Sequence, residues 1–318
     1  MRSFFVLLPV ISIKLKVDHY LRGLKQHMSK QIIQQEEKTA KVKNRKKRKR
    51  LALIIGALCI LLFSTKAFMD TNIFKVNRVH FQTNKIPAGS GFTIVQLSDV
   101  HNKVFGDNNE KLLETVEGID ADIIVLTGDL VDRRTTSFDY VFSLVERLTA
   151  LNQHVYFVSG NHEWDNPNRK SLLDGLEKRN VKLLNNQHTE LAIGNTTLNL
   201  AGVDDASTNH ENLDSAFENL DQENYTVLLS HTPSMLDKHN DIPADLILSG
   251  HTHGGQVRIP FIGALVAPDQ GFFPKLEKGI YEFGTNQFLY IDSGLGTSVA
   301  PIRFLNQSQL SVIKITGE

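Results

Sequence analysis

The distribution of hydrophobic and polar positions divides the chain into three regions. Residues 1–40 show little periodicity, and residues 51–63 form an unbroken apolar run, LALIIGALCILLF. From residue 91 to residue 315, short apolar runs alternate with amphipathic stretches. This alternation is typical of an α/β domain, in which buried strands alternate with helices that cover a sheet.

The apolar runs predict buried strands because they are short and rich in β-branched and aromatic residues. We expect the main strands over 92–99, 122–129, 154–161, 225–231, 245–251 and 287–294, and further strands over 197–203 and 310–315. Apolar residues that recur at intervals of three and four predict helices over 108–119, 137–151 and 168–179.

Five predicted strands end in a side chain that can bind a metal ion, namely Asp99, Asp129, Asn161, His231 and His251. The loops after these strands add His101, Asp132, His162 and His253. Ligand sites in α/β sheets form where the carboxyl ends of strands converge, so we expect these side chains to share one site. A single polar residue in a turn after a strand, or a single histidine, would be weak evidence for a metal site. Five strand ends of this kind, in order, indicate a metal centre.

The residue types favour two divalent ions. Asp129 stands in the middle of the ligand order, and a carboxylate has two oxygens with which to bridge two ions. Two ions about 3.5–4 Å apart can hold a hydroxide and clamp the oxygens of an in-line displacement at phosphorus. Carboxylates mixed with imidazoles suit Mn, Fe or Zn better than Ca²⁺.

Charge is distributed unevenly along the chain. Residues 1–50 carry 15 Lys+Arg against 3 Asp+Glu, and residues 51–318 carry 20 against 32. The acidic balance of the larger part argues against broad nucleic-acid binding by it. The single cysteine, Cys59, excludes an intramolecular disulfide and a cysteine-based zinc site.

The basic run KVKNRKKRKR (41–50) and the apolar run after it predict a membrane anchor. A helix extended from Leu51 to Met69 measures about 28 Å, close to the ~30 Å hydrocarbon core, provided that Lys66 reaches the interface. Lys and Arg resist translocation, so the N-terminus is expected in the cytoplasm and the rest outside it. A nucleic-acid or nuclear-localisation patch is the disfavoured alternative for the basic run.

These features predict four segments. They are a basic cytoplasmic arm (1–50), a transmembrane anchor (51–69), a linker with a leading strand (70–90) and a catalytic domain (91–318). Signal-peptidase cleavage is disfavoured because Thr65-Lys66-Ala67 fits the small-x-small pattern poorly. Met28 is an alternative start of the chain.

The ordered motifs SDVH, GDLVDR, GNHE, SHTP and GHTHGGQ resemble those of the calcineurin-like metallophosphoesterase superfamily, over about residues 91–315. The single span and the stretches GHTHGGQVRIPFIG and GLGTS resemble its bacterial membrane-associated branch, which includes proteins similar to UDP-2,3-diacylglucosamine pyrophosphatase. The resemblance implies a four-layer α/β/β/α sandwich with two mixed sheets, here preceded by a single transmembrane helix.

The resemblance also implies roles for individual residues. The first metal would be held by Asp99, His101, Asp129 and His253, and the second by Asp129, Asn161, His231 and His251. His162 would act as the acid or leaving-group stabiliser, with Asp132 to orient it. Arg133 would contact the phosphate, although Arg134 beside it is an alternative.

Three neighbouring positions carry further expectations. Glu163 is expected to fix a loop, and Trp164 to pack against the domain. Where many relatives have an arginine beside the glycine of GLG, this chain has Asp292 and Ser293. An acidic side chain there is expected to alter the charge preference for substrate.

We therefore expect a membrane-anchored, two-metal phosphoesterase that uses metal-bound hydroxide on a phosphodiester, pyrophosphate or phosphomonoester, with a lipid-linked or cell-envelope substrate. One alternative is a cytoplasm-facing nucleotide phosphodiesterase or nuclease of the same fold. The other, a non-catalytic membrane module, is disfavoured because no ligand is missing. No nucleic-acid or protein partner is expected. Segment 258–281, rich in Phe, Gly and Pro, is either a lid or groove for an apolar substrate tail or a connection packed on the core.

Overall fold

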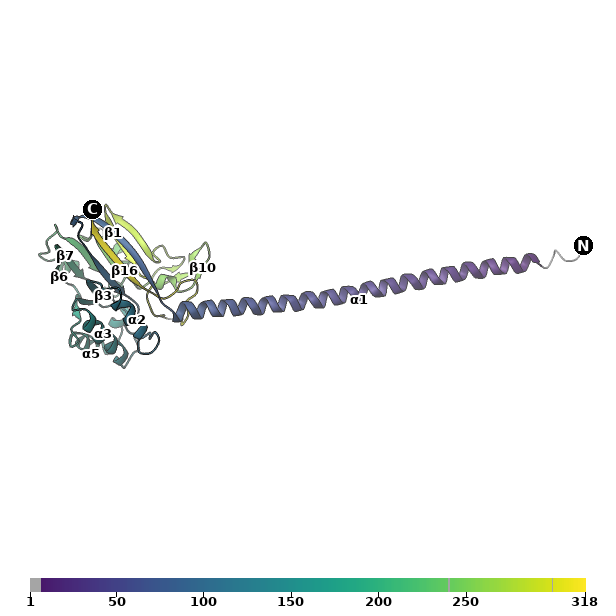
Figure 1. Cartoon of the computed structure of the whole chain (residues 1–318), viewed down its shortest axis with the longest axis horizontal. Helices are drawn as coiled ribbons and strands as arrows, with labels where there is room; N and C mark the ends of the chain where they lie inside the picture. Colours follow the sequence, from purple (N-terminus) through teal and green to yellow (C-terminus); the bar gives the residue numbers. More distant parts are fainter. Residues whose placement is uncertain (1–6, 240, 299) are drawn as a thin grey trace, which may run out of the picture. The chain divides into compact units, whose positions relative to one another are not determined.

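The computed structural model describes residues 7–239, 241–298 and 300–318. The chain divides into two compact units, Met1–Ser64 and Thr65–Glu318. Over its described residues the first unit is helical, and its helix α1 (Leu7–Asn72) continues into the second unit (Figure 1). Side chains from Leu51 to Phe63 are exposed, and the mean hydropathy of the most apolar window of α1 is 2.2. By length and composition, α1 can cross a membrane.

The second unit contains two six-stranded sheets. The first has the order β1-β16-β2-β3-β4-β5, with bounds Lys75–Ala88, Gln309–Gly317, Gly91–Leu97, Ile123–Thr127, Val155–Val158 and Lys182–Leu183. The second has the order β14-β15-β9-β8-β7-β6, with bounds Gly279–Gly284, Gln287–Ile291, Leu246–Ser249, Tyr225–Leu229, Thr196–Gly202 and Gln187–Ile193. Both sheets are mixed, because β16 runs antiparallel to β2, and β14 and β6 run antiparallel to their neighbours.

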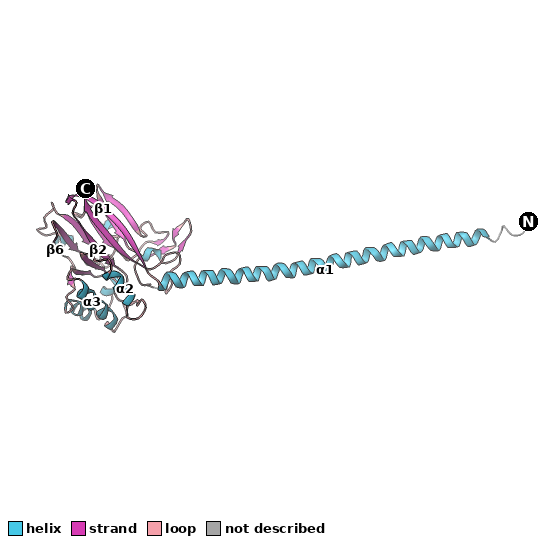
Figure 2. Cartoon of the chain, in the orientation of Figure 1, coloured by secondary structure: helices cyan, strands magenta, loops and turns pink. Residues whose placement is uncertain are grey.

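Three buried apolar clusters separate four layers. One joins the first sheet to helices α2 (Glu110–Glu117), α3 (Asp139–Leu151) and α5 (Arg169–Glu177). The second lies between the two sheets. The third joins the second sheet to the short helices α6 (Leu213–Ala216) and α7 (Met235–Lys238). The predicted α/β/β/α sandwich is therefore confirmed (Figure 2).

Burial on both faces explains the unbroken apolar runs. In β3, Ile124 and Leu126 join the cluster beneath the helices, whereas Ile123 and Val125 join the cluster between the sheets. Strands buried on both faces read as continuous hydrophobic runs instead of alternating ones. All eight predicted strands and all three predicted helices are present, with ends one to three residues inside the predicted limits at most of their termini.

The elements that were not predicted carry weaker patterns. Strands β6 and β14 form the two opposite edges of the second sheet, and nearly all of their side chains are exposed or only partly covered. Segment 258–281 forms two short hairpins, β10 (Arg258–Ile259) with β11 (Gly263–Ala264) and β12 (Val266–Ala267) with β13 (Gly271–Phe272).

Candidate metal centre

The predicted ligands follow strands β2, β3, β4, β8 and β9 and lie at one end of the two sheets. Five of them have positive backbone φ angles, namely Asp99 (49°), His101 (45°), Asp129 (53°), His251 (68°) and His253 (52°). Side chains other than glycine rarely adopt this conformation, and it clusters at functional sites, where the surrounding structure holds it in place. The backbone of these loops is thus shaped to turn the side chains toward one another.

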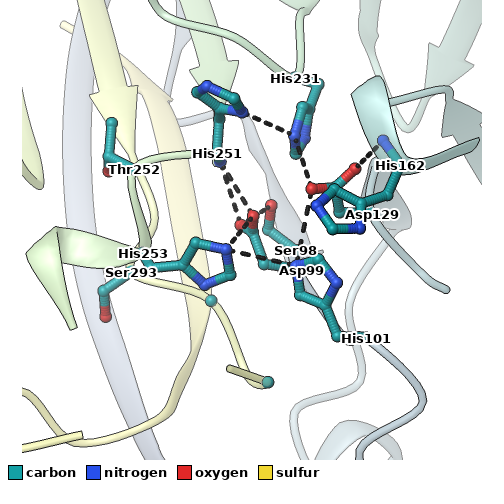
Figure 3. A network of polar contacts seen from close by, with 12 residues as sticks. Ser98, Asp99, His101, Asp129, His162, His231, His251, Thr252, His253 and Ser293 are labelled. Atoms are coloured by element: carbon teal, nitrogen blue, oxygen red, sulfur yellow. Dashed lines mark hydrogen bonds and ion pairs between the residues drawn. The ribbon is translucent and has the colours of Figure 1, made fainter. Parts of the chain in front are cut away.

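The first group of side chains is Asp99, His101, Asp129 and His253, whose ligand atoms lie together. The Nε2 atoms of His101 and His253 are 3.3 Å apart, and each lies 3.5 Å from a carboxylate oxygen, of Asp129 and Asp99 respectively. Ligand atoms about 2.1 Å from one ion lie roughly 3.0–3.4 Å from each other. The spacing of this group therefore suits one metal ion (Figure 3).

The second group shares a residue with the first. It contains Asp129, His231 and His251. Nε2 of His231 lies 3.2 Å from Oδ2 of Asp129 and 3.3 Å from Nδ1 of His251. Oδ2 of Asp129 thus stands between imidazoles of both groups, as a bridging carboxylate would.

Hydrogen bonds on the far side of two rings select the nitrogen that is free to bind an ion. Nδ1 of His231 donates to the carbonyl oxygen of Thr127 at 2.8 Å, which leaves Nε2 without a proton in the neutral ring. Nε2 of His251 donates to the carboxylate of Asp269 at 2.7 Å, which leaves Nδ1 free. Carboxylate or carbonyl partners of this kind orient metal-binding histidines and raise their basicity.

We expect Asp269→Asn to lower metal affinity or activity by about tenfold, the lower end of the effect of such orienting partners, because Asp269 is half exposed. Metal titration followed by hydrolysis at saturating metal would separate the two effects. Glu282→Gln, on the exposed face of β14, is the matched control. Equal metal affinity and rate in both variants would show that Asp269 does not orient His251.

Buried polar atoms support a bound ion at this place. Oδ1 of Asn161 is buried and has no hydrogen-bond partner among the described residues. Asn161 precedes His162, whose backbone N–H donates to Oδ1 of Asp129 at 3.0 Å. An unsatisfied buried acceptor costs about 1–3 kcal/mol, and a bound cation would offset that cost.

Electrostatics at neutral pH give the first group of side chains its ligand-competent forms. Burial lowers the pKa of His101 to about 4, so its ring is neutral. Burial raises the pKa of Asp99 to about 6, below neutral pH. For Asp129, burial acts to raise the pKa, but His231, His101 and His162 together outweigh it and hold the pKa well below its usual value. Metal binding requires neutral imidazoles and ionised carboxylates. His231 is the exception, because burial acts to lower its pKa but Asp129 and neighbouring carboxylates outweigh burial and raise the pKa well above the usual value, so an ion bound there displaces a proton.

Glu163 fixes two of the ligand loops, as expected. Its fully buried carboxylate accepts hydrogen bonds from the backbone N–H groups of Asp129, Gly160 and Leu130 at 2.8 Å and of Val131 at 3.3 Å. One side chain thereby holds the loop after β3 against the loop after β4.

His162 lies beside the first group, with its ring 4.6 Å from that of His101. Its Nδ1 accepts from the backbone N–H of Arg133 at 3.2 Å, and its Nε2 lies 3.1 Å from the guanidinium of Arg133. Oδ2 of Asp132 is 3.5 Å from Nδ1 of His162. Arg134 contributes only a backbone N–H to Asp132, so Arg133 is the arginine that borders the site.

The expectation for the segment IDSGLG is wrong. Asp292 is fully buried and accepts hydrogen bonds from Ser311, Gln309 and the backbone N–H of Gly294. Its carboxylate fixes the loop and does not face a substrate. Its hydrogen-bond partners from strand β16, Gln309 and Ser311, lie within the core.

Arg303 lies outside every motif identified in the sequence. Its side chain is fully buried, and it donates to the carbonyl oxygens of Gly296 and Ser293 at 2.6 Å. Burial lowers the pKa of Arg303 to about 10, so it stays charged at neutral pH. It ties the GLG loop to the back of the metal centre, where its Nη1 is 3.4 Å from the carbonyl oxygen of His253.

Trp164 packs, as expected. Its ring is stacked on that of His210, with centroids 3.3 Å apart, and the guanidinium of Arg169 covers it at 3.7 Å. Its Nε1 donates to the carboxylate of Asp204. With both faces occupied, the indole offers no platform for a substrate ring.

Comparison with known proteins gives consistent matches. The chain matches the calcineurin-like phosphoesterase family over residues 92–255. It is similar to the uncharacterized metallophosphoesterase YkoQ of Bacillus subtilis, at 29% identity over 83% of this chain and 99% of the relative. An uncharacterized metallophosphoesterase of Aquifex aeolicus is 30% identical over 81% of this chain and 98% of its own length. A zebrafish transmembrane protein with a metallophosphoesterase domain is 26% identical, over 83% of this chain and 61% of the relative.

Proposed function

Because the chain belongs to the calcineurin-like phosphoesterase family and is a metal-dependent phosphoester hydrolase, we propose that it acts through a two-metal centre on the phosphodiester, pyrophosphate or phosphomonoester of a membrane or cell-envelope compound. The observation that carries this proposal is the position of Asp129. Its carboxylate belongs to both groups of ligand atoms, and each group has the spacing of a metal shell.

The proposed ligand sets are those that the resemblance implies. Asp99, His101, Asp129 and His253 would hold one divalent ion, and Asp129, Asn161, His231 and His251 the other, with Mn, Fe or Zn suited to these donors. When bound, two such ions activate a water molecule as nucleophile and polarise the phosphoryl oxygens.

The side chains outside the two ligand groups have separate tasks in this proposal. The guanidinium of Arg133, which is half exposed beside His162, pairs with a phosphoryl oxygen through charge-assisted hydrogen bonds. His162 stabilises or protonates the leaving oxygen. Burial lowers the pKa of His162, and Asp132, with Oδ2 3.5 Å from Nδ1, partly offsets that effect. Glu163 keeps the loops of Asp129 and Asn161 in register.

We also propose that the enzyme is anchored by residues 51–69, with a basic cytoplasmic arm (1–50), a linker with a leading strand (70–90) and an extracytoplasmic catalytic domain (91–318). The length and hydropathy of α1 support a span, the basic run before it supports this orientation, and a similar zebrafish protein is named as transmembrane. Reporter fusions after residue 70 test the orientation. An active cytoplasmic reporter would contradict it.

We expect the full chain in detergent to hydrolyse bis-p-nitrophenyl phosphate, to lose this activity when stripped of metal, and to regain it with Mn²⁺ or Zn²⁺. His251→Ala and Asn161→Ala should lower the restored rate by roughly a hundredfold or more, because each removes a donor from the second ion. His80→Ala, on the exposed part of β1, is the matched control. A metal-stripped enzyme that keeps its full rate would refute the proposal.

A further inference from the structure

The two hairpins that follow the last metal ligands carry large apolar side chains that the domain leaves uncovered. Phe261 is fully exposed, and Phe272 and Phe273 are exposed by 73% and 61%. The hairpins adjoin at Leu265, whose backbone N–H donates to the carbonyl oxygen of Val257 beside the first hairpin and whose carbonyl oxygen accepts from Phe273 of the second. We call Phe261, Ile262, Phe272 and Phe273 the hairpin patch. Large apolar side chains left exposed on neighbouring hairpins indicate an interaction surface.

The hairpin patch is connected to the place where α1 meets the domain. The segment Arg303–Ser308 bonds to α1 on one side, through Arg303 N–H to Oγ1 of Thr71 and Ser308 N–H to the carbonyl of Asp70, both at 2.9 Å. On its other side, Phe304 exchanges backbone hydrogen bonds with Gln256 and Arg258 at 3.0 Å. The last residues of α1, from Thr65 onward, belong to the same compact unit as the hairpins.

A hollow of about 450 Å³ lies between the first hairpin and the segment Arg303–Ser308. It is lined by Ile259, Phe261 and Ile262 of the first hairpin and by Leu305 of the segment that bonds to α1. A second hollow of about 330 Å³ is lined by Val257, Val266 and Ala267 of the hairpins and by His253 of the metal centre. Val266, an exposed apolar residue of the second hairpin, thus lines the same hollow as a predicted ligand.

The charge distribution favours a lipid surface as the partner of the hairpin patch. Residues 51–318 are acidic, with 20 Lys+Arg against 32 Asp+Glu, whereas residues 257–278 carry 3 against 2. An acidic surface is repelled by anionic headgroups, so this segment is the one suited to approach them. Lys275, two residues after Phe273 in the sequence, is exposed. Aromatic rings with basic neighbours are typical of membrane interfaces.

We propose that the hairpin patch lies in the headgroup region of the bilayer that α1 crosses, so that the metal centre takes phosphoesters carried at the membrane surface. The inference rests on the proposed span. The tie between α1 and Arg303–Ser308 holds the hairpins near that surface, and the hollow that reaches His253 gives an apolar substrate chain a path to the metal centre.

The test uses the full chain in phosphatidylcholine–phosphatidylglycerol vesicles that contain nitroxide-labelled lipids. A Cys59→Ala background with Phe272→Cys carries an environment-sensitive fluorophore at position 272. Lipid nitroxides should quench it at least threefold more strongly than the same probe at Lys170→Cys. Lys170 is an exposed residue of α5, which Figure 1 shows away from β10. Equal quenching at both positions would overturn the proposal.

The native chain labelled at Cys59, inside the predicted span, separates failure of the patch from failure of the anchor. Strong quenching at Cys59 with none at position 272 would leave the anchor in place and refute membrane contact by the patch. No quenching at either position would refute both. Neither outcome depends on phosphoesterase activity, so the proposed reaction stands or falls separately.

Discussion

Asp129→Asn is expected to lower kcat/KM by roughly a thousandfold, equivalent to about 4 kcal/mol of transition-state stabilisation. The carboxylate of Asp129 lies 3.2 Å from Nε2 of His231 and 3.5 Å from Nε2 of His101, so its loss affects both groups of ligand atoms. An amide keeps the shape of the side chain but removes the charge and one acceptor oxygen. Hydrolysis of bis-p-nitrophenyl phosphate at saturating metal measures the effect.

Asp120→Asn is the matched control, because Asp120 is exposed in the turn after α2, where its positive φ suits an asparagine. The control should keep its rate and its metal content. An Asp129→Asn enzyme within tenfold of the native rate would mean that no bridging carboxylate is needed.

Glu163→Gln is expected to destabilise the fold by roughly 3–5 kcal/mol, which corresponds to about 10 °C in Tm. Each carboxylate oxygen of Glu163 accepts from two backbone N–H groups, Oε1 from Leu130 and Val131, and Oε2 from Asp129 and Gly160. The amide nitrogen of glutamine cannot accept, so two buried N–H groups lose their partner. Thermal unfolding measures the loss.

Glu177→Gln, in an exposed position at the end of α5, should leave Tm within about one degree. A Glu163→Gln variant that is as stable as this control would show that the four hydrogen bonds do not hold the loops. A stable but inactive variant would instead assign Glu163 to the reaction.

The sequence predicts the centre of the molecule well for a physical reason. Strands β2, β3 and β4 are buried on both faces, so each appears as a continuous apolar run, and the metal ligands follow directly where each run stops. Side chains such as Asp129 and His251 can therefore be recognised as candidate metal ligands by their residue type and their position at a strand end.

Contacts between segments that are far apart in the sequence could not be predicted from it. Asp269 orients His251 only because a hairpin folds back over the ligand loop, 18 residues further along the chain. Arg303 carries no motif, and its role comes from complete burial behind the GLG loop. From the sequence, Asp292 is expected to alter the charge preference for substrate, whereas its carboxylate accepts hydrogen bonds from Ser311 and Gln309 of β16 within the core.

The number of metal ions bound per chain tests the central claim most directly. Elemental mass spectrometry on the full chain, purified in detergent and dialysed against Mn²⁺ or Zn²⁺, should give two ions per chain, and no more than one in Asp129→Asn or His251→Ala. A folded native chain that binds one ion or none, with the same content in both variants, would contradict a two-metal centre at these residues.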